Sequence, residues 1–315
     1  MTSHSLINTP ITTPVALLIF NRPDTTARVF GAIRNARPPI LLVVADGPRA
    51  GNPDDARMCA AARALIENID WPCRVLKNFS DVNLGCRQRV SSGLDWVFSM
   101  VEEAIILEDD CLPHPTFFHY CDELLARYRD DTRIMHISGN NFRINRSHNP
   151  YSYYFSRYNH IWGWASWRRA WKFYDVTMKL WPEIRNDKRL FDVFSDRAST
   201  RFWSSMFDRA YRGEINTWDF QWTFACWVQS GSSILPAKTL VSNIGFDSGA
   251  THTKSSSGRL ATLDLEEMPF PLAHPQYVIR DAQADLSMER DVYRSGLWRR
   301  LRSRIRRIAG PGELS

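Results

Sequence analysis

The 315-residue chain lacks the features that mark several large classes of protein. Its longest apolar runs, Val15–Phe20 and Ile40–Ala45, are far shorter than the roughly 20 residues of a membrane-spanning helix. The opening MTSHSLINTP has no basic segment followed by an apolar one, so we expect no secretory signal and a cytoplasmic location. The six cysteines show neither a CxxC pair nor the Cys/His spacing of a zinc site, which favours free thiols over disulfides.

Two glycine-rich nucleotide-binding motifs are also absent. The chain contains neither GxxxxGK[ST] nor GxGxxG, which argues against P-loop NTPases and dinucleotide-dependent dehydrogenases. The GxSxG motif does not occur either. A nucleotide bound by this chain would therefore be held by carboxylates and a metal ion rather than by a glycine loop.

The positive charge is concentrated in one short segment. The chain has 40 Lys and Arg against 34 Asp and Glu, a net charge of +6. Residues 289–307 hold eight arginines and two acidic residues, so this segment accounts for the whole excess. The rest of the chain is neutral, which argues against a broad nucleic-acid-binding surface and against nucleic acid as a partner.

That basic segment has the pattern of an amphipathic helix, which we expect over residues 289–309. At 100° per residue its apolar residues gather on one side and its arginines take the rest. We expect residues 297–308 to lie on an anionic membrane surface, on the inner face of the cytoplasmic membrane. A solvated basic terminus, or a helix that docks on an acidic partner, is the alternative. The apolar positions are Leu297, Trp298, Leu301, Ile305 and Ile308.

The first half of the chain alternates apolar runs with helical patterns. Residues 1–13 are polar and read as a flexible leader. The runs that follow are apolar without alternation, which is typical of parallel strands buried on both faces. We therefore expect an α/β fold with a right-handed βαβ sheet and helices on both faces. The expected strands are Val15–Phe20, Ile40–Ala45, Arg74–Leu76 and Ala104–Leu107, and a helix is expected to begin at the cap Asp24-Thr25-Thr26.

Tryptophan dominates the second half: nine of the twelve lie between residues 162 and 227. Such density suits a wall that stacks flat rings while staying partly wet. A second, Trp-rich core packed against the sheet is the alternative.

The strongest chemical signal is a run of three acids, Glu108-Asp109-Asp110, directly after the strand Ala104–Leu107. Alternation along an extended strand would place Glu108 and Asp110 on one face and Asp109 on the other. Ligands of open α/β sheets bind beyond the carboxyl ends of the strands. Carboxylates at that place form a hard oxygen site for Mg²⁺ or Mn²⁺, completed by water and substrate phosphates. The alternative is a solvated acidic turn.

Two further segments are placed to contact a nucleotide. Asp46 ends a second strand at the same expected edge, where its carboxylate would accept hydrogen bonds from ribose or base, although Asp-Gly-Pro is also a common turn. Residues 81–89 combine turn residues with a basic helix start. There Asn83, Arg87 and Arg89 would hold a diphosphate.

Taken in order, these motifs resemble a GT-A glycosyltransferase, and in particular bacterial sugar transferases similar to the N-acetylglucosaminyltransferase I family. The resemblance covers about residues 14–253 and implies a mixed, mostly parallel sheet with helices on both faces. It implies a nucleotide-binding half, 14–110, an acceptor half, 111–253, and an extension, 254–288. The motifs are Asn21-Arg22-Pro23, Asp46-Gly47-Pro48, Leu107–Pro113, Trp162-Gly163-Trp164 and Trp218-Asp219-x-x-Trp222.

Residue by residue, Asp110 resembles the family's direct metal ligand, and Glu108 and Asp109 resemble residues around the donor sugar and the metal-bound waters. Asp46 resembles the nucleoside-binding carboxylate. His252 resembles a late residue near the diphosphate and the metal, and is otherwise an ordinary loop histidine. The donor-binding set implied by the resemblance is Asn21, Arg22, Asp46, Asn83, Arg87, Arg89, Glu108 and Asp109.

On the acceptor side, Asp219 resembles the general base of inverting members, with a helix cap or salt-bridge partner as its alternative role. Trp162, Trp164, Trp218 and Trp222 are expected to bind the acceptor. The chain departs from the animal enzymes in lacking their membrane anchor and in its shorter acceptor side, so the identity of the acceptor does not carry over.

Together these observations predict an Mn²⁺- or Mg²⁺-dependent, inverting glycosyltransferase. Its partners would be a nucleotide-sugar donor and a hydroxyl acceptor on a cell-surface glycan or lipid-linked saccharide. A carbohydrate-binding or inactive scaffold protein of the same fold is the alternative outside the transferases. A sugar-1-phosphate nucleotidyltransferase is a further alternative, but the segment after the first strand lacks the glycine-rich, basic loop expected of one.

Overall fold

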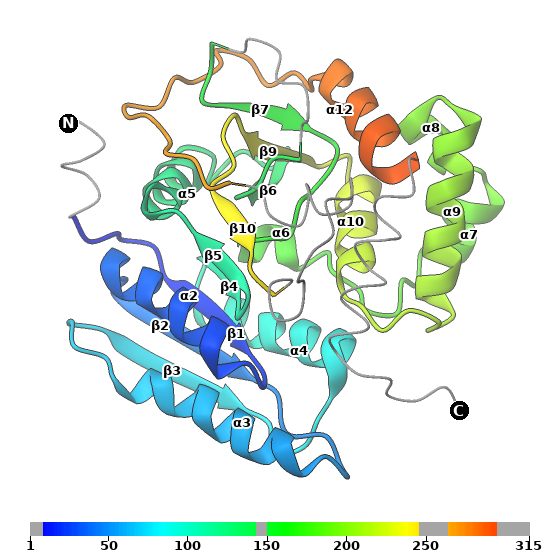
Figure 1. Cartoon of the computed structure of the whole chain (residues 1–315). Helices are drawn as coiled ribbons and strands as arrows, with labels where there is room; N and C mark the ends of the chain where they lie inside the picture. Colours follow the sequence, from blue (N-terminus) through cyan, green and yellow to red (C-terminus); the bar gives the residue numbers. More distant parts are fainter. Residues whose placement is uncertain (1–8, 143–149, 246–263, 295–315) are drawn as a thin grey trace, which may run out of the picture.

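A computed structural model describes residues 9–142, 150–245 and 264–294 (Figure 1). An eight-stranded sheet forms its centre, with the strand order β3-β2-β1-β4-β8-β6-β9-β7. These strands are β1 (Val15–Ile19), β2 (Ile40–Ala45), β3 (Arg74–Phe79), β4 (Glu103–Glu108), β6 (Ile134–Ser138), β7 (Tyr153–Ser156), β8 (Trp164–Trp167) and β9 (Ser232–Pro236). A separate antiparallel pair joins β5 (Cys111–Pro113) to β10 (Val241–Asn243).

The four strands of the first half pair in parallel. β1 lies between β2 and β4, and β2 also pairs with β3. All residues of β1 are buried, which is why the sequence shows an uninterrupted apolar run rather than alternation. The four predicted strands are confirmed. Their bounds differ mainly at β3, which continues beyond the expected Leu76 to Phe79.

In the second half the sheet becomes mixed. β8 runs antiparallel to both β4 and β6, so β6 runs in the same direction as β4. β9 pairs in parallel with β6, and β7 closes the sheet antiparallel to β9. The carboxyl ends of β1, β2, β4 and β6 therefore meet at one edge, which is the edge where open α/β sheets bind ligands.

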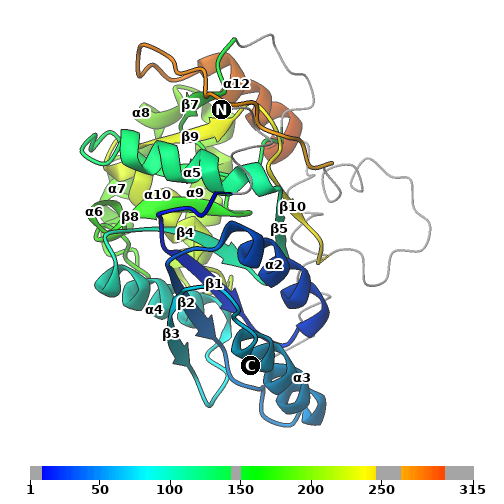
Figure 2. The same cartoon turned by 90° about the vertical axis from the view of Figure 1, so that its left-hand side faces the viewer.

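Helices cover both faces of the sheet (Figures 1 and 2), and this confirms the predicted fold class. α2 contacts α3 and α5 on one face, whereas α4 contacts α6 together with β1, β2 and β4 on the other. The helices are α2 (Pro23–Ala36), α3 (Pro53–Ala64) with the 3₁₀ turn η1 (Leu65–Glu67), α4 (Gly85–Met100), α5 (Pro115–Arg127), α6 (Arg168–Trp171), α7 (Trp181–Asn186), α8 (Leu190–Phe194), α9 (Arg197–Tyr211), α10 (Asp219–Val228) and α12 (Ala282–Met288).

The start of α2 corrects the predicted helix cap. The cap position is Arg22, and Pro23 is the first helical residue, so Asp24 lies inside the first turn. Proline suits this position because its fixed φ is helical and its missing N–H would have no partner in the first turn. The Thr26 hydroxyl donates to the Arg22 carbonyl at 2.6 Å.

The end of the described chain is packed into the body. α12 is followed by a π-helical turn, η2 (Glu289–Arg294), which contacts α9. Residues 289–294 of the expected basic helix thus belong to the folded domain, and Glu289 and Val292 are buried. Residues 297–308, the expected membrane-binding part, lie outside the described residues. None of the helices in the described ranges is long and apolar enough to cross a membrane.

Candidate functional site

The three acids lie where β4 ends at the ligand-binding edge of the sheet. β4 stops at Glu108, and Asp109 and Asp110 form a turn before β5. The prediction that all three continue an extended strand is therefore wrong, because the chain must turn here to enter β5. Their clustering does not depend on strand alternation, since all three face the same counter-charge, Arg22.

Arg22 ties this turn to the loop after β1. Its Nη1 lies 2.5 Å from Asp110 Oδ2 and 3.6 Å from Asp109 Oδ1. The other oxygen of Asp109 accepts a hydrogen bond from the Phe20 N–H at 3.0 Å. Burial lowers the pKa of Arg22, but the two carboxylates more than offset this and the net change is upward. The guanidinium stays charged and partly neutralises the acids.

One guanidinium does not balance three carboxylates. Burial, and then repulsion from Asp110 and Asp109, raises the pKa of Glu108 to about 8. Burial raises the pKa of Asp109 to about 6, against the opposing influence of Arg22. The cluster is therefore short of positive charge at neutral pH, which is the electrostatic condition that favours a further cation.

The acidic turn offers oxygen ligands of the kind that a divalent metal binds. Carboxylate oxygens are the ligands that Mg²⁺ and Mn²⁺ prefer. Within the described ranges, no three His, Cys, Asp or Glu side chains form a preassembled metal site. Mg²⁺ commonly binds through one or two carboxylates, with substrate phosphates and water supplying the rest. The acids fit that mode, in which Asp110 would exchange its contact with Arg22 for the ion. His252 lies outside the described residues.

Asp46 lies at the end of β2, as predicted, but its carboxylate is fully engaged within the protein. It accepts hydrogen bonds from the backbone N–H of Gly47, Leu84 and Gly85 and from Asn83 Nδ2, all at 2.9–3.0 Å. Asp46 and Asn83 thus join the loop after β2 to the loop after β3. This is the turn role that the sequence left open for Asp46, and a nucleoside would have to share these oxygens.

The predicted phosphate-binding role of Arg89 needs correction. Arg89 is buried and donates to the Ala45 carbonyl at 3.1 Å and to Asn78 Oδ1 at 2.8 Å. Burial lowers its pKa. Its guanidinium therefore holds β2 and β3 together and has no free surface for a diphosphate. The sequence could not reveal this, because a basic residue near the start of a helix reads the same whether it points outward or under the sheet.

The two other polar residues of the predicted donor set are also committed to protein contacts. Arg87 donates through Nη2 to the Val176 carbonyl at 2.6 Å, and its backbone N–H donates to Asn216. Asn21 donates through Nδ2 to Asp55 Oδ1 at 2.7 Å. The hydrogen bond with Arg49 lowers the pKa of Asp55 to about 2; burial opposes this, and the hydrogen bond from Asn21 adds to it. Asp55 is therefore an ionised anchor for the loop after β1.

Asp219 is the first residue of α10 and lies close to the acidic turn. It is buried, its carboxylate accepts a hydrogen bond from the Thr217 hydroxyl, and its charge contributes to the raised pKa of Glu108. The Thr223 hydroxyl, one turn along the helix, contacts the Asp219 carbonyl and Asn159 Oδ1 at 3.0 and 2.8 Å. The structure thus brings Asp219 within electrostatic reach of Glu108 from a segment 111 residues later in the chain.

The tryptophans predicted to bind the acceptor form a core instead. Trp164, Trp218 and Trp222 expose 0–2% of their surface, and Trp162 only 8%. The ring centroid of Trp164 lies 5.6 Å from that of Trp218 and 5.8 Å from that of Trp222. A sugar stacks on an open ring face, and these faces are covered by other rings. The alternative of a second, Trp-rich core is correct for these residues.

A group of buried polar side chains at the same edge is not predicted by the sequence motifs. Asn140 follows β6, and both atoms of its side-chain amide lack a hydrogen-bond partner, as do Asn159 Nδ2 and His160 Nε2. Buried polar atoms normally have partners, so such atoms indicate a place where water or a ligand binds. The position of Asn140 in the sequence could have indicated this, because Asn140 comes shortly after a buried strand, as Asp109 does.

Comparison with known proteins adds little to this geometry. No family model and no curated protein matches the chain. Among 54 similar chains of solved structures is UDP-glucose pyrophosphorylase complexed with UDP-glucose, with 9% sequence identity and a TM-score of 0.24. The match covers 43% of this chain and 66% of that chain, so it spans just under two thirds of the pyrophosphorylase. A likeness this low carries no argument about activity, and function must be inferred from the site.

Proposed function

We propose that the protein is a glycosyltransferase that moves a sugar from a nucleotide-diphosphate donor to a hydroxyl acceptor. The observation that carries this proposal is the acidic turn Glu108–Asp110 at the ligand-binding edge, with Arg22 against it and Asp219 nearby. A transferase of this kind needs charge stabilisation for a leaving diphosphate and a base for the incoming hydroxyl. The two sets of carboxylates could serve these separate needs.

The acidic turn would receive the diphosphate with Mn²⁺ or Mg²⁺, which neutralises the charge that develops on the leaving group. Asp110 and Glu108 are the residues that would hold the ion. Arg22 would leave Asp110 and remain beside the phosphates, because a guanidinium matches phosphate oxygens as well as carboxylate oxygens. These steps give Glu108, Asp110 and Arg22 a role each.

Asp219 would take the proton of the acceptor hydroxyl, which makes the reaction an inverting, direct displacement. Its carboxylate is buried and is oriented by the Thr217 hydroxyl, so it is held in one place rather than solvated. Water exclusion and fixed geometry favour proton transfer in the transition state. The acceptor we propose is a cell-surface glycan or a lipid-linked saccharide, reached with the help of residues 297–308 on an anionic membrane.

The test is nucleoside diphosphate release from a panel of nucleotide sugars, with Mn²⁺ or EDTA present. We expect turnover with at least one donor, loss of turnover in EDTA, and loss in Asp110→Asn. Asp219→Asn should slow transfer about 100-fold or more, the usual scale for a general base, while donor binding changes little. Asp54→Asn, an exposed acid on α3, is the matched control and should behave as wild type.

The outcomes separate the alternatives. If the protein binds a nucleotide sugar but releases no nucleoside diphosphate with any acceptor mixture, the carbohydrate-binding scaffold is favoured. Pyrophosphate exchange with a sugar 1-phosphate would favour the nucleotidyltransferase. Full activity in EDTA would contradict the metal role, and near-normal turnover of Asp219→Asn would remove the support for inversion.

A further inference from the structure

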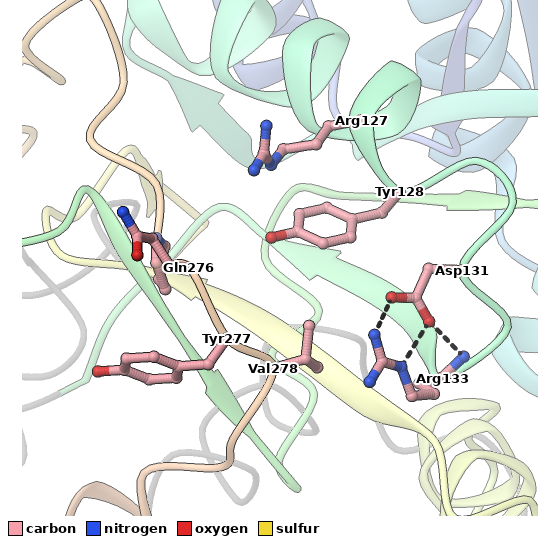
Figure 3. Close-up of a pocket in the computed structure, with 8 residues that line it drawn as sticks. Arg127, Tyr128, Asp131, Arg133, Gln276, Tyr277 and Val278 are labelled. Atoms are coloured by element: carbon pink, nitrogen blue, oxygen red, sulfur yellow. Dashed lines mark hydrogen bonds and ion pairs between the residues drawn. The ribbon is translucent and has the colours of Figure 1, made fainter.

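A hollow of about 570 Å³ opens at the edge of the sheet opposite the acidic turn (Figure 3). Asp131 and Arg133 in its wall come just before β6, which runs in the same direction as β4. The acidic turn lies at the carboxyl end of β4, so the hollow lies about 17 Å away at the least, the length of a five-residue strand. It is lined by Arg127, Tyr128, Asp131, Arg133, Pro275, Gln276, Tyr277 and Val278.

The lining carries an excess of one positive charge. Arg133 is neutralised by Asp131, which accepts from its Nε and Nη2 at 2.9 and 2.7 Å (Figure 3). Arg127, the last residue of α5, has no carboxylate partner among the described residues; a hydrogen bond with Tyr128 raises its pKa, and its guanidinium lies 5.7 Å from the centre of the Tyr128 ring. In Figure 3, Arg127 and Tyr128 point from α5 toward the segment that carries Gln276. Arg127 is exposed, so an anionic group of a ligand can pair with its guanidinium from the solvent side.

The opposite wall offers an aromatic ring and an amide. Gln276 and Tyr277 are both exposed, and Tyr277 leaves 51% of its surface open. The ring of Tyr151 meets that of Tyr277 edge to face, with centroids 6.0 Å apart, which fixes the orientation of the Tyr277 ring. A flat, amphipathic, exposed ring on the same segment as the Gln276 amide is suited to a pyranose, which has an apolar face and a rim of hydroxyls.

Hydrogen bonds join the two walls and hold the hollow in shape. The Tyr128 hydroxyl lies 2.7 Å from that of Tyr153, which lies 3.0 Å from His274 Nδ1. His274 Nε2 lies 2.8 Å from a carboxylate oxygen of Glu123 on α5. α5 is thus linked at two places to the segment around residue 274. These bonds hold the lining residues in place, and a site with fixed residues loses little entropy on binding.

We propose that this hollow is a saccharide-binding site for a sugar that carries a carboxylate or a phosphate. Arg127 would pair with the anionic group, Tyr277 would stack on the ring, and Gln276 would bind hydroxyls. That the saccharide is part of the acceptor glycan, held at a second point during transfer, rests on the proposed function. The binding itself does not depend on the chemistry at the acidic turn.

The test is equilibrium binding to the full chain by saturation-transfer NMR and calorimetry, with three probes. A hyaluronan tetrasaccharide carries carboxylates, glucose 6-phosphate carries a phosphate, and chitotetraose is neutral. We expect at least one acidic probe to bind, with chitotetraose weaker by about tenfold or more. Arg127→Gln should weaken the acidic probe about tenfold, and Tyr277→Ala should weaken it by a similar factor. The acidic probe that binds identifies the source of the anionic group.

Two exposed residues outside the hollow provide matched controls, Arg57→Gln and Tyr211→Ala, which should leave binding unchanged. Binding is measured without turnover, so a failure of the proposed transferase leaves this measurement readable. The proposal is overturned if neither acidic probe binds saturably. It is equally overturned if Arg127→Gln and Tyr277→Ala bind as wild type, or if chitotetraose binds as tightly as the acidic probes.

Discussion

At the scale of single residues, the hydrogen bonds in the interior of the second half require one buried histidine to stay neutral. His136 is fully buried among the tryptophans, and its neutral ring satisfies two neighbours at once. One nitrogen, Nδ1, accepts the indole N–H of Trp222 at 3.1 Å, which leaves Nε2 to donate to the His160 carbonyl at 2.9 Å. A second proton would sit on Nδ1 and face the Trp222 N–H. Burial lowers the pKa of His136 to about 3.

This predicts a loss of stability in weak acid. The folded pKa of His136 lies below the ordinary value of 6.5, so between pH 6.5 and 3 the unfolded chain binds a proton that the folded chain excludes. Its stabilising contribution is present above pH 6.5 and is lost as the pH falls. From pH 7 to pH 5 the loss is about 2 kcal/mol for this residue. His160, whose pKa burial lowers to about 4, acts in the same direction.

Denaturant unfolding of wild type and His136→Gln at pH 7 and pH 5 measures this. Glutamine retains a donor and an acceptor but does not titrate, so we expect the variant to lose about 2 kcal/mol less over this interval. The difference in the free energy of unfolding between the variant and wild type at pH 7 is the baseline for the comparison. An equal loss in both proteins would show that His136 is not responsible.

At the scale of secondary-structure elements, the sequence predicted best where burial alone determines the pattern. Strands β1, β2 and β4 are recognisable because a parallel strand covered on both faces must be apolar throughout. The acidic turn was located correctly for the same reason, since its acids follow β4. The extended geometry predicted for Glu108–Asp110 is wrong because the chain turns at Asp109 and Asp110 to enter β5. The three residues of β5 show no sequence pattern that would predict a strand.

The predictions from the sequence are wrong where a residue type suits both an exposed and a buried orientation of the side chain. A tryptophan suits both a wet sugar-binding wall and a dry core, and only the helix packing of α10 against the sheet decides between them. Arginine likewise can donate its hydrogen bonds to a phosphate or, as Arg89 does, to backbone carbonyls. Asp219 was singled out from its Trp-flanked motif and the family resemblance. Its closeness to Glu108 depends on the long-range path of the chain, which no local pattern contains.

A buried ion pair between Asp285 and Arg157 fastens α12 to the body of the protein. Asp285 is 1% exposed and accepts from the Ser156 hydroxyl at 2.5 Å and from Arg157 Nε at 3.3 Å. Asp285→Ala would leave the buried Arg157 with one remaining acid, Glu289, 3.8 Å away. We expect a loss of about 3–5 kcal/mol in the free energy of unfolding, the usual cost of breaking a buried ion pair.

Asp281→Ala is the matched control for this change. Asp281 caps the same helix by accepting from the Ala284 N–H at 2.9 Å, and loss of such a cap costs about 1 kcal/mol. Chemical denaturation of the two variants gives the comparison. If Asp285→Ala costs no more than Asp281→Ala, the buried ion pair does not fasten α12.

At the scale of the whole molecule, the two proposed sites lie at opposite ends of the strands. The carboxyl edge holds the acidic turn, Asp219 and the buried polar group at Asn140, and the opposite edge holds the hollow near Arg127. Apart from residues 289–307 the chain carries no net charge, and that segment holds the whole excess of +6. Buried contacts of Glu289 with the hydroxyls of Tyr158 and Ser199 show that the body itself continues into η2.

This boundary decides how the membrane hypothesis is tested. A chain cut before Glu289 would lose buried contacts, so any change in its behaviour would mix unfolding with loss of the basic segment. A chain ending at residue 296 keeps η2 and removes six of the eight arginines and all five apolar residues of the expected membrane-binding face. We expect this shortened chain to keep the melting temperature of the full chain, since Asp285 and Glu289 retain their partners.

We predict that the full chain co-sediments with vesicles containing phosphatidylserine at low salt and that the chain ending at residue 296 does not. Each arginine near an anionic surface contributes on the order of 1 kcal/mol, so six are enough for reversible binding. The same charge makes the binding weaken as salt is raised, because exposed charges are screened within about 10 Å at 0.1 M. Vesicles of neutral lipid should retain little of either chain. Binding that survives the cut, or that is indifferent to lipid charge, would place the membrane contact elsewhere and leave the arginines to an acidic protein partner.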